Sequence, residues 1–181
     1  KETVEALQGL SERPLVLREI PIRDGEHVSG HVDLDSERAF KWTPGKPSEL
    51  ISIPDSVKER EQGARTELLE SLADFDDSLL EKLLEDVIPS TEDIYKNLTK
   101  DLQQSLIVPV FFGSAERDNG IRRLLKSLRH EAPDVAVTAK RLGIDAKGGA
   151  LAQVFKTLHA GHAGKLSYAR VWRGELADAM T

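Results

Sequence analysis

The sequence contains no cysteine among its 181 residues. A disulfide framework and thiolate metal sites are therefore excluded, and the composition fits a reducing compartment. No apolar run reaches the length of a membrane span, and no basic stretch followed by an apolar one opens the chain. We therefore expect a cytoplasmic protein that makes no membrane contact. Because the first residue is Lys1 rather than Met, we also expect either a fragment of a longer protein or a processed chain.

A phosphate-binding loop is also missing from the sequence. The pattern Gly-x-x-x-x-Gly-Lys-Ser/Thr does not occur, and its nearest match is Gly164-Lys165. His159 stands there in place of the first glycine, and Leu166 follows the lysine where a hydroxyl residue is needed. Zinc is not expected either, because His27, His31, His159 and His162 have no cysteine to complete a set of four ligands.

Charge is unevenly distributed along the chain, whose formal net charge is −6. Residues 55–104 hold 14 acidic and 6 basic residues. An acidic segment is unsuited to gripping phosphates, so we expect no direct nucleic-acid contact from it. It suits either docking onto a basic protein or a solvated helical face. Glu81, Glu85 and Asp86 have helical spacing, which favours a solvated face over a pair of hydrolytic carboxylates.

The pattern of apolar residues predicts short strands followed by helices. Strands are predicted over 15–22, 28–34, 37–42 and 49–53, joined by turns as an antiparallel meander. Helices are predicted over 55–75, 78–87 and 90–102, with Ser78 and Glu81 as a capping box and Ser90 as an N-cap. The face Leu79, Leu80, Leu83, Leu84 and Val87 is typical of a core-facing helix.

A strand, a short loop and a helix follow. Residues 107–112 form an unbroken apolar run, which predicts a strand buried on both faces, with Pro109 placing it at a sheet edge. Gly113-Ser114-Ala115 then leads through a polar bend into an amphipathic helix over 121–128. Loops at the carboxyl ends of strands in α/β sheets are where ligands usually bind. Arg122 and Arg123, at the start of the helix, are expected to face solvent or a partner.

Gly113-Ser114-Ala115 resembles the last guanine-recognition motif of a GTP-binding domain. In that family the amide at the alanine position binds the guanine carbonyl oxygen, and the serine supports the loop. The order of the other parts is similar to elongation factor G, whose GTPase domain carries an insertion with a Gly-x-Val/Ile-Asp-Leu segment, here residues 30–34, followed by helices rich in Glu and Leu. Residues 164–176 resemble the opening hairpin of that family's second domain, a β-barrel.

The resemblance implies an α+β fold with an α/β remnant. Residues 1–133 would be the C-terminal part of a GTPase domain, with the insertion subdomain at about 14–105. Residues 134–147 would be a linker, and 148–181 the start of a truncated β-barrel. Unpaired strand edges there would permit a strand-exchanged oligomer.

By the same resemblance, the parent protein binds and hydrolyses GTP with Mg on the ribosome. Its acidic helices would touch the ribosomal stalk protein, here through Glu67, Glu70, Glu81 and Glu85. The chain itself has no catalytic residue or metal ligand to assign, needs no cofactor of its own, and should neither hydrolyse GTP nor hold it tightly, because the phosphate and magnesium sites lie elsewhere.

Two alternatives stay open from the sequence. In the first alternative the chain is catalytic. Either another polypeptide supplies the missing half of a GTPase, or the chain carries an unrelated hydrolase site. Otherwise it is a non-catalytic protein-interaction module with an acidic helical surface, in which Gly-Ser-Ala occurs by chance. A phosphate loop encoded upstream of Lys1 would separate these alternatives.

Overall fold

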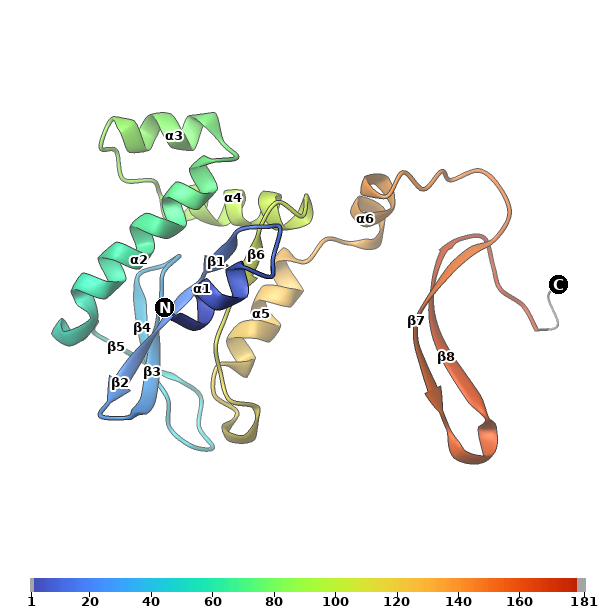
Figure 1. Ribbon diagram of the computed structural model, residues 1–181, viewed down its shortest axis with the longest axis horizontal. Coiled ribbons are helices and arrows are strands. Elements are labelled where there is room, and N and C mark those ends of the chain that lie inside the picture. Colours follow the sequence, from blue (N-terminus) through green and yellow to red (C-terminus); the bar gives the residue numbers. More distant parts are fainter. Residues whose placement is uncertain (1, 179–181) are drawn as a thin grey trace. The chain divides into compact units, whose positions relative to one another are not determined.

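The computed structural model describes residues 2–178, which form an α+β structure in two compact units, Lys1–Ala132 and Pro133–Thr181. In the first unit, the helices are α1 (Glu2–Gln8), α2 (Asp55–Ala73), α3 (Asp77–Leu84), α4 (Thr91–Gln103) and α5 (Ile121–Glu131), with a 3₁₀ turn η1 (Ala115–Arg117) (Figure 1). Its strands are β1 (Leu15–Leu17), β2 (Glu19–Asp24), β3 (His27–Asp33), β4 (Arg38–Lys41), β5 (Glu49–Ile51) and β6 (Val108–Val110).

The predicted antiparallel meander is confirmed as a four-stranded sheet in the order β2-β3-β4-β5. Gly30 on β3 faces Lys41 on β4. A Cβ at position 30 would overlap the carbonyl of Phe40, so the close approach of these two strands requires glycine there.

The prediction of one strand over 15–22 is wrong, because the chain changes sheets at Arg18. Leu15–Leu17 forms β1 and pairs in parallel with β6, whereas β2 pairs with β3. The amide of Arg18 donates to the carbonyl of Val110 at 3.0 Å, and its own carbonyl accepts from the amide of Leu34 at 3.0 Å. One residue therefore joins the two sheets through its backbone.

Strand β6 is shorter and more exposed than its sequence predicts. It covers Val108–Val110, and within the described residues its one partner strand is β1. Val108 is 41% exposed. The expected burial on both faces is therefore wrong, because within residues 2–178 no second strand or helix layer covers its outer side. In the two-stranded sheet formed by the described residues, β6 lies at an edge, in agreement with the position predicted from Pro109.

The long helix α2 packs on β1 and β2 and carries much of the core. Leu68, Leu72 and Val57 are buried there, with Ile94 and Leu98 of α4 and Val16, Val32 and Leu34 of the strands. Each such side chain contributes on the order of 1.5–3 kcal/mol through burial. This core holds α2 and α4 against the strands of the first unit.

Helix α3 differs from its prediction at both its start and its face. Asp76, not Ser78, caps it, since its carboxylate accepts from the amide of Leu79 at 3.0 Å. Leu79 is buried, but Leu80, Leu84 and Val87 are exposed. The short helix has one neighbouring helix, α2, among its main contacts, so only one side of it is covered. Ser90, by contrast, caps α4 as predicted.

Helix α5 carries its apolar residues outward. Leu125 and Leu128 are 58% and 56% exposed, whereas Ser127 and Glu131 are buried. The polar side of this helix therefore holds it against the rest of the first unit, which leaves the apolar face of the helix uncovered.

The second unit consists of α6 (Val135–Arg141), β7 (Leu151–His159), a 3₁₀ turn η2 (Gly161–Ala163) and β8 (Lys165–Arg173). Helix α6 lies inside the segment 134–147 predicted as a linker, and Asp134 caps it by accepting from the amide of Val137 at 2.8 Å. Strands β7 and β8 form an antiparallel hairpin. Whether residues 148–181 begin a barrel, and whether copies exchange strands, stay predictions. Residues 179–181 lie outside the described part of the chain.

Candidate functional site

The loop Gly113-Ser114-Ala115 leaves the carboxyl end of β6 and is closed by its own backbone. Ser114 donates its amide to Asn119 at 2.9 Å, and Asn119 donates back to Ser114 at 3.1 Å. A Cβ on Gly113 would overlap the carbonyl of Asn119, and Gly120 has a φ of +77°. Both glycines are therefore required by the bend.

The loop presents free hydrogen-bond donors. Ala115 is exposed and opens the 3₁₀ turn, and the first amides of a helix have no partner within it. Within residues 2–178, the amides of Ala115 and Glu116 make no hydrogen bond. Ser114 is half-buried and extended, and its backbone closes the bend. The geometry suits binding of a ligand oxygen by one or two backbone amides.

A buried ion cluster holds this loop region to the four-stranded sheet. We define the cluster by Arg18, Asp33, Asp35, Arg123 and Glu131. Arg18 is fully buried, and its guanidinium donates to Asp35 (Nε to Oδ1, 2.8 Å, and Nη2 to Oδ2) and to Glu131 (Nη1 to Oε2, 2.7 Å). Burial disfavours the charged guanidinium, but these hydrogen bonds raise the pKa of Arg18 above its ordinary value. The contact joins Arg18 to Glu131, which lies 113 positions further along the chain.

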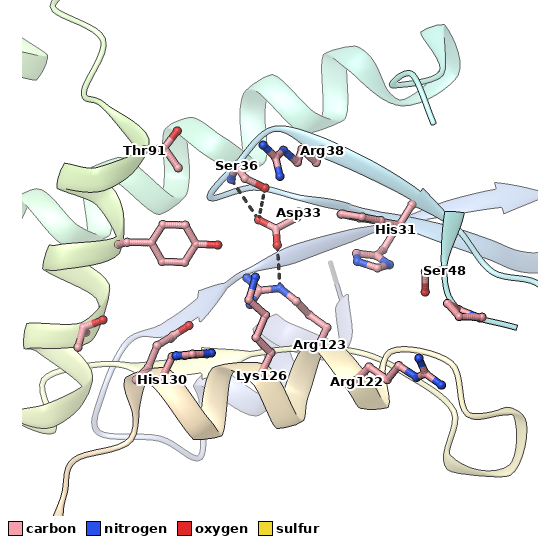
Figure 2. Close-up of a pocket in the computed structure, with 15 residues that line it drawn as sticks. His31, Asp33, Ser36, Arg38, Ser48, Thr91, Arg122, Arg123, Lys126 and His130 are labelled. Atoms are coloured by element: carbon pink, nitrogen blue, oxygen red, sulfur yellow. Dashed lines mark hydrogen bonds and ion pairs between the residues drawn. The ribbon is translucent and has the colours of Figure 1, made fainter. Parts of the chain in front are cut away.

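Arg123 completes the cluster from α5, so the expectation that it faces solvent or a partner is wrong. Its Nε lies 2.7 Å from Asp33 Oδ2 (Figure 2), and its Nη2 donates to Asp35 Oδ2 at 2.7 Å. The ring of Phe111 lies against both guanidiniums. Its centroid is 5.3 Å from Cζ of Arg18 and 5.4 Å from Cζ of Arg123. Such cation–π contacts add to the ion pairs when they are desolvated. Arg122, in contrast, is exposed.

Two further titratable groups lie between the cluster and the strand that ends in the loop. Glu19 accepts from the amide of Phe112 at 3.4 Å, and its Oε1 lies 3.5 Å from His31 Nε2. Burial raises the pKa of the Glu19 carboxyl to about 7. Burial also lowers the pKa of His31 to about 4, so its ring is neutral near pH 7.

Most of this cluster is not apparent from sequence patterns. Asp33 lies in the segment 30–34 that carries part of the resemblance, but no motif or spacing in the sequence marks Asp35 or Glu131. Arg18 carries one signal, because its charge directly follows the apolar run Leu15-Val16-Leu17. A buried strand tolerates such a residue only with a partner.

The carboxylates expected to bind a partner are all exposed. Glu67 and Glu70 lie on α2, and Glu81 and Glu85 lie on and directly after α3. Leu80, Leu84 and Ile88 are exposed beside the latter pair. The surface is therefore acidic with apolar residues between the charges. Among the described residues, no three His, Asp or Glu side chains gather as a metal site would require, and no helix has the length and apolar character needed to cross a bilayer.

The ion cluster predicts the effect of removing its central cation. Arg18→Met leaves Asp35 and Glu131 buried with too little counter-charge, so we expect unfolding free energy to fall by about 3–5 kcal/mol. Arg18→Lys keeps the charge but loses the forked geometry, so it should also destabilise the protein. Urea unfolding followed by far-UV circular dichroism measures both. Arg13→Met, on an exposed side chain, is the control; a loss below about 1 kcal/mol for Arg18→Met would contradict the role of the cluster.

Glu19 predicts a pH dependence of stability. Its folded pKa of about 7 exceeds the ordinary 4.5, so the native state keeps the proton and this contribution to stability is lost as pH rises from 4.5 to 7. His31 acts in the opposite sense, because its lowered pKa removes stability as pH falls from 6.5 to 4. Substitution of Glu19 separates its contribution to the pH dependence of stability from that of His31.

Urea unfolding of the wild type and Glu19→Gln at several pH values tests this effect. The stability of the wild type relative to the variant should fall by about 1–3 kcal/mol between pH 4.5 and 7. The exposed Glu26→Gln should leave the wild-type profile unchanged. Parallel profiles for wild type and Glu19→Gln would show that the Glu19 carboxyl titrates as in the unfolded chain.

Comparison with known proteins finds no matching family model. The chain is 44% identical over 180 residues to an elongation factor G-like protein of Synechocystis sp., covering 98% of this chain and 27% of that protein. It is 32% identical to elongation factor G 2 of Desulfotalea psychrophila, covering 87% of this chain and 25% of that one. A crystal structure from Thermus thermophilus superposes with a TM-score of 0.72 at 28% identity, over 96% of this chain and 24% of that one.

The chain thus spans about a quarter of the length of the curated relatives it matches. The sequence alignment extends over both units, and the fold agrees with the solved structure over nearly the whole chain. The chain belongs to the elongation factor G family as a segment of such a protein.

Proposed function

We propose that this chain supplies the guanine-binding side of the nucleotide site in a ribosome-associated translational GTPase. The observation that carries the proposal is the closed loop after β6, whose Ala115 amide is exposed and makes no hydrogen bond within residues 2–178. The names of the relatives, elongation factor G and elongation factor G-like protein, support the translational role. Hydrolysis would belong to the whole protein.

In this proposal the Ala115 amide donates to the guanine carbonyl oxygen, and Gly113 and Ser114 hold the loop in shape. A backbone amide fixed by the fold is well suited to select a base, because it cannot turn away from its acceptor. Phosphates and Mg²⁺ would be bound by the remainder of the parent protein, so the nucleotide binds at the junction of the two parts.

The uncovered face of α5 supports this arrangement. Leu124, Leu125 and Leu128 form an exposed apolar stripe, and β1 and β6 form a parallel pair, a type of sheet that occurs with both faces covered. Further strands of a GTPase domain placed beside this pair would be covered by the α5 stripe. Exposed apolar surface of this kind marks an interaction site.

The acidic surface of α2 and α3 would bind the ribosome through its stalk protein in the cytoplasm. The surface is negatively charged because of Glu67, Glu70, Glu81 and Glu85. Apolar area between these charges comes from Leu80 and Leu84. A basic partner with an apolar centre fits such a surface. The same surface favours the alternative, a non-catalytic interaction module, in which the guanine contact would be absent.

Ala115→Pro in the full-length parent tests the guanine contact. Proline at this position removes the amide hydrogen alone, because the first position of a helical turn tolerates proline. Ser114 before it is extended, with φ −132° and ψ 113°, close to the region that precedes proline. We expect GDP affinity to fall about 5- to 100-fold, corresponding to one lost hydrogen bond to a buried acceptor.

Ala115→Ser keeps the amide and serves as the matched control for GDP binding by calorimetry. An unchanged melting temperature for Ala115→Pro shows that the loop is intact. If both variants bind GDP like the wild type, the loop does not contact guanine and the interaction-module alternative is favoured.

A further inference from the structure

A cavity of about 710 Å³ lies in the first unit, with walls from strands β3 and β4, helix α4 and helix α5 (Figure 2). Its size is within the range of small-molecule sites, about 300–1,000 Å³. Residues 113–120 are not part of its lining, so it is separate from the loop after β6.

One wall carries a stripe of basic side chains. Arg122, Lys126 and His130 line the cavity from α5 at a spacing of four residues, which places them on one helical face. Figure 2 shows Lys126 and His130 rising from α5 into the space between the helix and the strands. Arg38 adds a fourth basic group from β4. Within residues 2–178, no ion pair engages these four side chains.

The carboxylates at this site are already paired. Asp33 is bound by Arg123 at 2.7 Å, and Glu131 is bound by Arg18 at 2.7 Å. The unpaired charge facing the cavity is therefore positive, although the whole chain is acidic with a net charge of −6. A local excess of unpaired positive charge in an otherwise acidic protein favours an anionic ligand.

The opposite wall carries hydroxyl groups. Thr91, Tyr95 and Thr99 line the cavity from α4, again at a spacing of four residues, and Ser36 and Ser48 add two more from the strand side. His31 is 3% exposed, lines the same cavity, and has no hydrogen-bond partner for Nδ1 within the described residues. A buried polar atom without a partner is rare and is commonly satisfied by a bound molecule.

We propose that this cavity binds a small molecule with two or more linked phosphate groups. Arginine, lysine and hydroxyl groups are the side chains that bind phosphate oxygens. Arg122 and Lys126 lie four residues apart on α5, a rise of about 6 Å between their Cα atoms, and their long side chains can turn toward linked phosphate groups from two points on the helix. The proposal does not depend on the guanine contact proposed for Ala115.

Calorimetric titration of the 181-residue chain with inorganic pyrophosphate tests the site. We expect saturable one-site binding at low salt, weakened about tenfold or more by Arg122→Ala combined with Lys126→Ala. Arg129→Ala is the matched control, because Arg129 is exposed on the same helix and does not line the cavity; it should change affinity by less than about twofold. Circular dichroism melting verifies that each variant is folded.

Absence of saturable binding, or an equal loss with Arg129→Ala, would overturn the proposal. ATP and GTP should bind alike, because the proposed contacts are made to the linked phosphates that both carry. A single-stranded RNA oligonucleotide or a polyglutamate peptide that binds more tightly than pyrophosphate would assign the cavity to a macromolecule instead. Ala115→Pro should leave pyrophosphate binding unchanged, so failure of this proposal is distinguishable from failure of the guanine contact.

Discussion

The structure of the first unit depends on the burial of one guanidinium, that of Arg18. A fully buried cation is tolerated only when carboxylates surround it with good geometry, because the cost of desolvation is large. Asp35 comes from the turn after β3, and Glu131 comes from the end of α5. The same residue binds β6 and the turn after β3 through its backbone. Its position therefore fixes the two sheets and α5 relative to one another.

This constraint explains why α5 is turned with its polar side inward. Arg123, Ser127 and Glu131 follow one another at a spacing of four and face the cluster or the interior. The apolar stripe must then point away from the interior of the first unit, and no part of that unit covers it. Because α5 is anchored by directional ion pairs, the loop between β6 and α5 has both ends fixed. A loop held in this way can present backbone amides at constant positions, which base recognition requires.

Local sequence patterns predict the positions of most helices and strands, but they predict less well which side of each helix or strand is buried. The meander, the three helices after it and the strand-loop-helix unit follow from periodicity and turn residues. The break at Arg18, the cap at Asp76 and the outward side of α5 do not, because they are decided by contacts between distant residues. Leu124 and Leu125 have core periodicity, yet both are exposed, and the rest of the first unit does not cover them. For the loop, Gly113 and Gly120 marked the bend, but only the fold shows the free amides.

The three stripes of α5 indicate that this helix is the point where separate interactions meet. The buried polar stripe binds the four-stranded sheet, the apolar stripe faces away from it, and Arg122, Lys126 and His130 face the cavity beside α4. Each stripe repeats at three or four residues, so each occupies a distinct face. Ligand in the cavity and nucleotide at the loop would both act on one rigid helix. Coupling between them would require that either ligand shift α5, and the ion pairs of Arg123 to Asp33 and Asp35 resist such a shift.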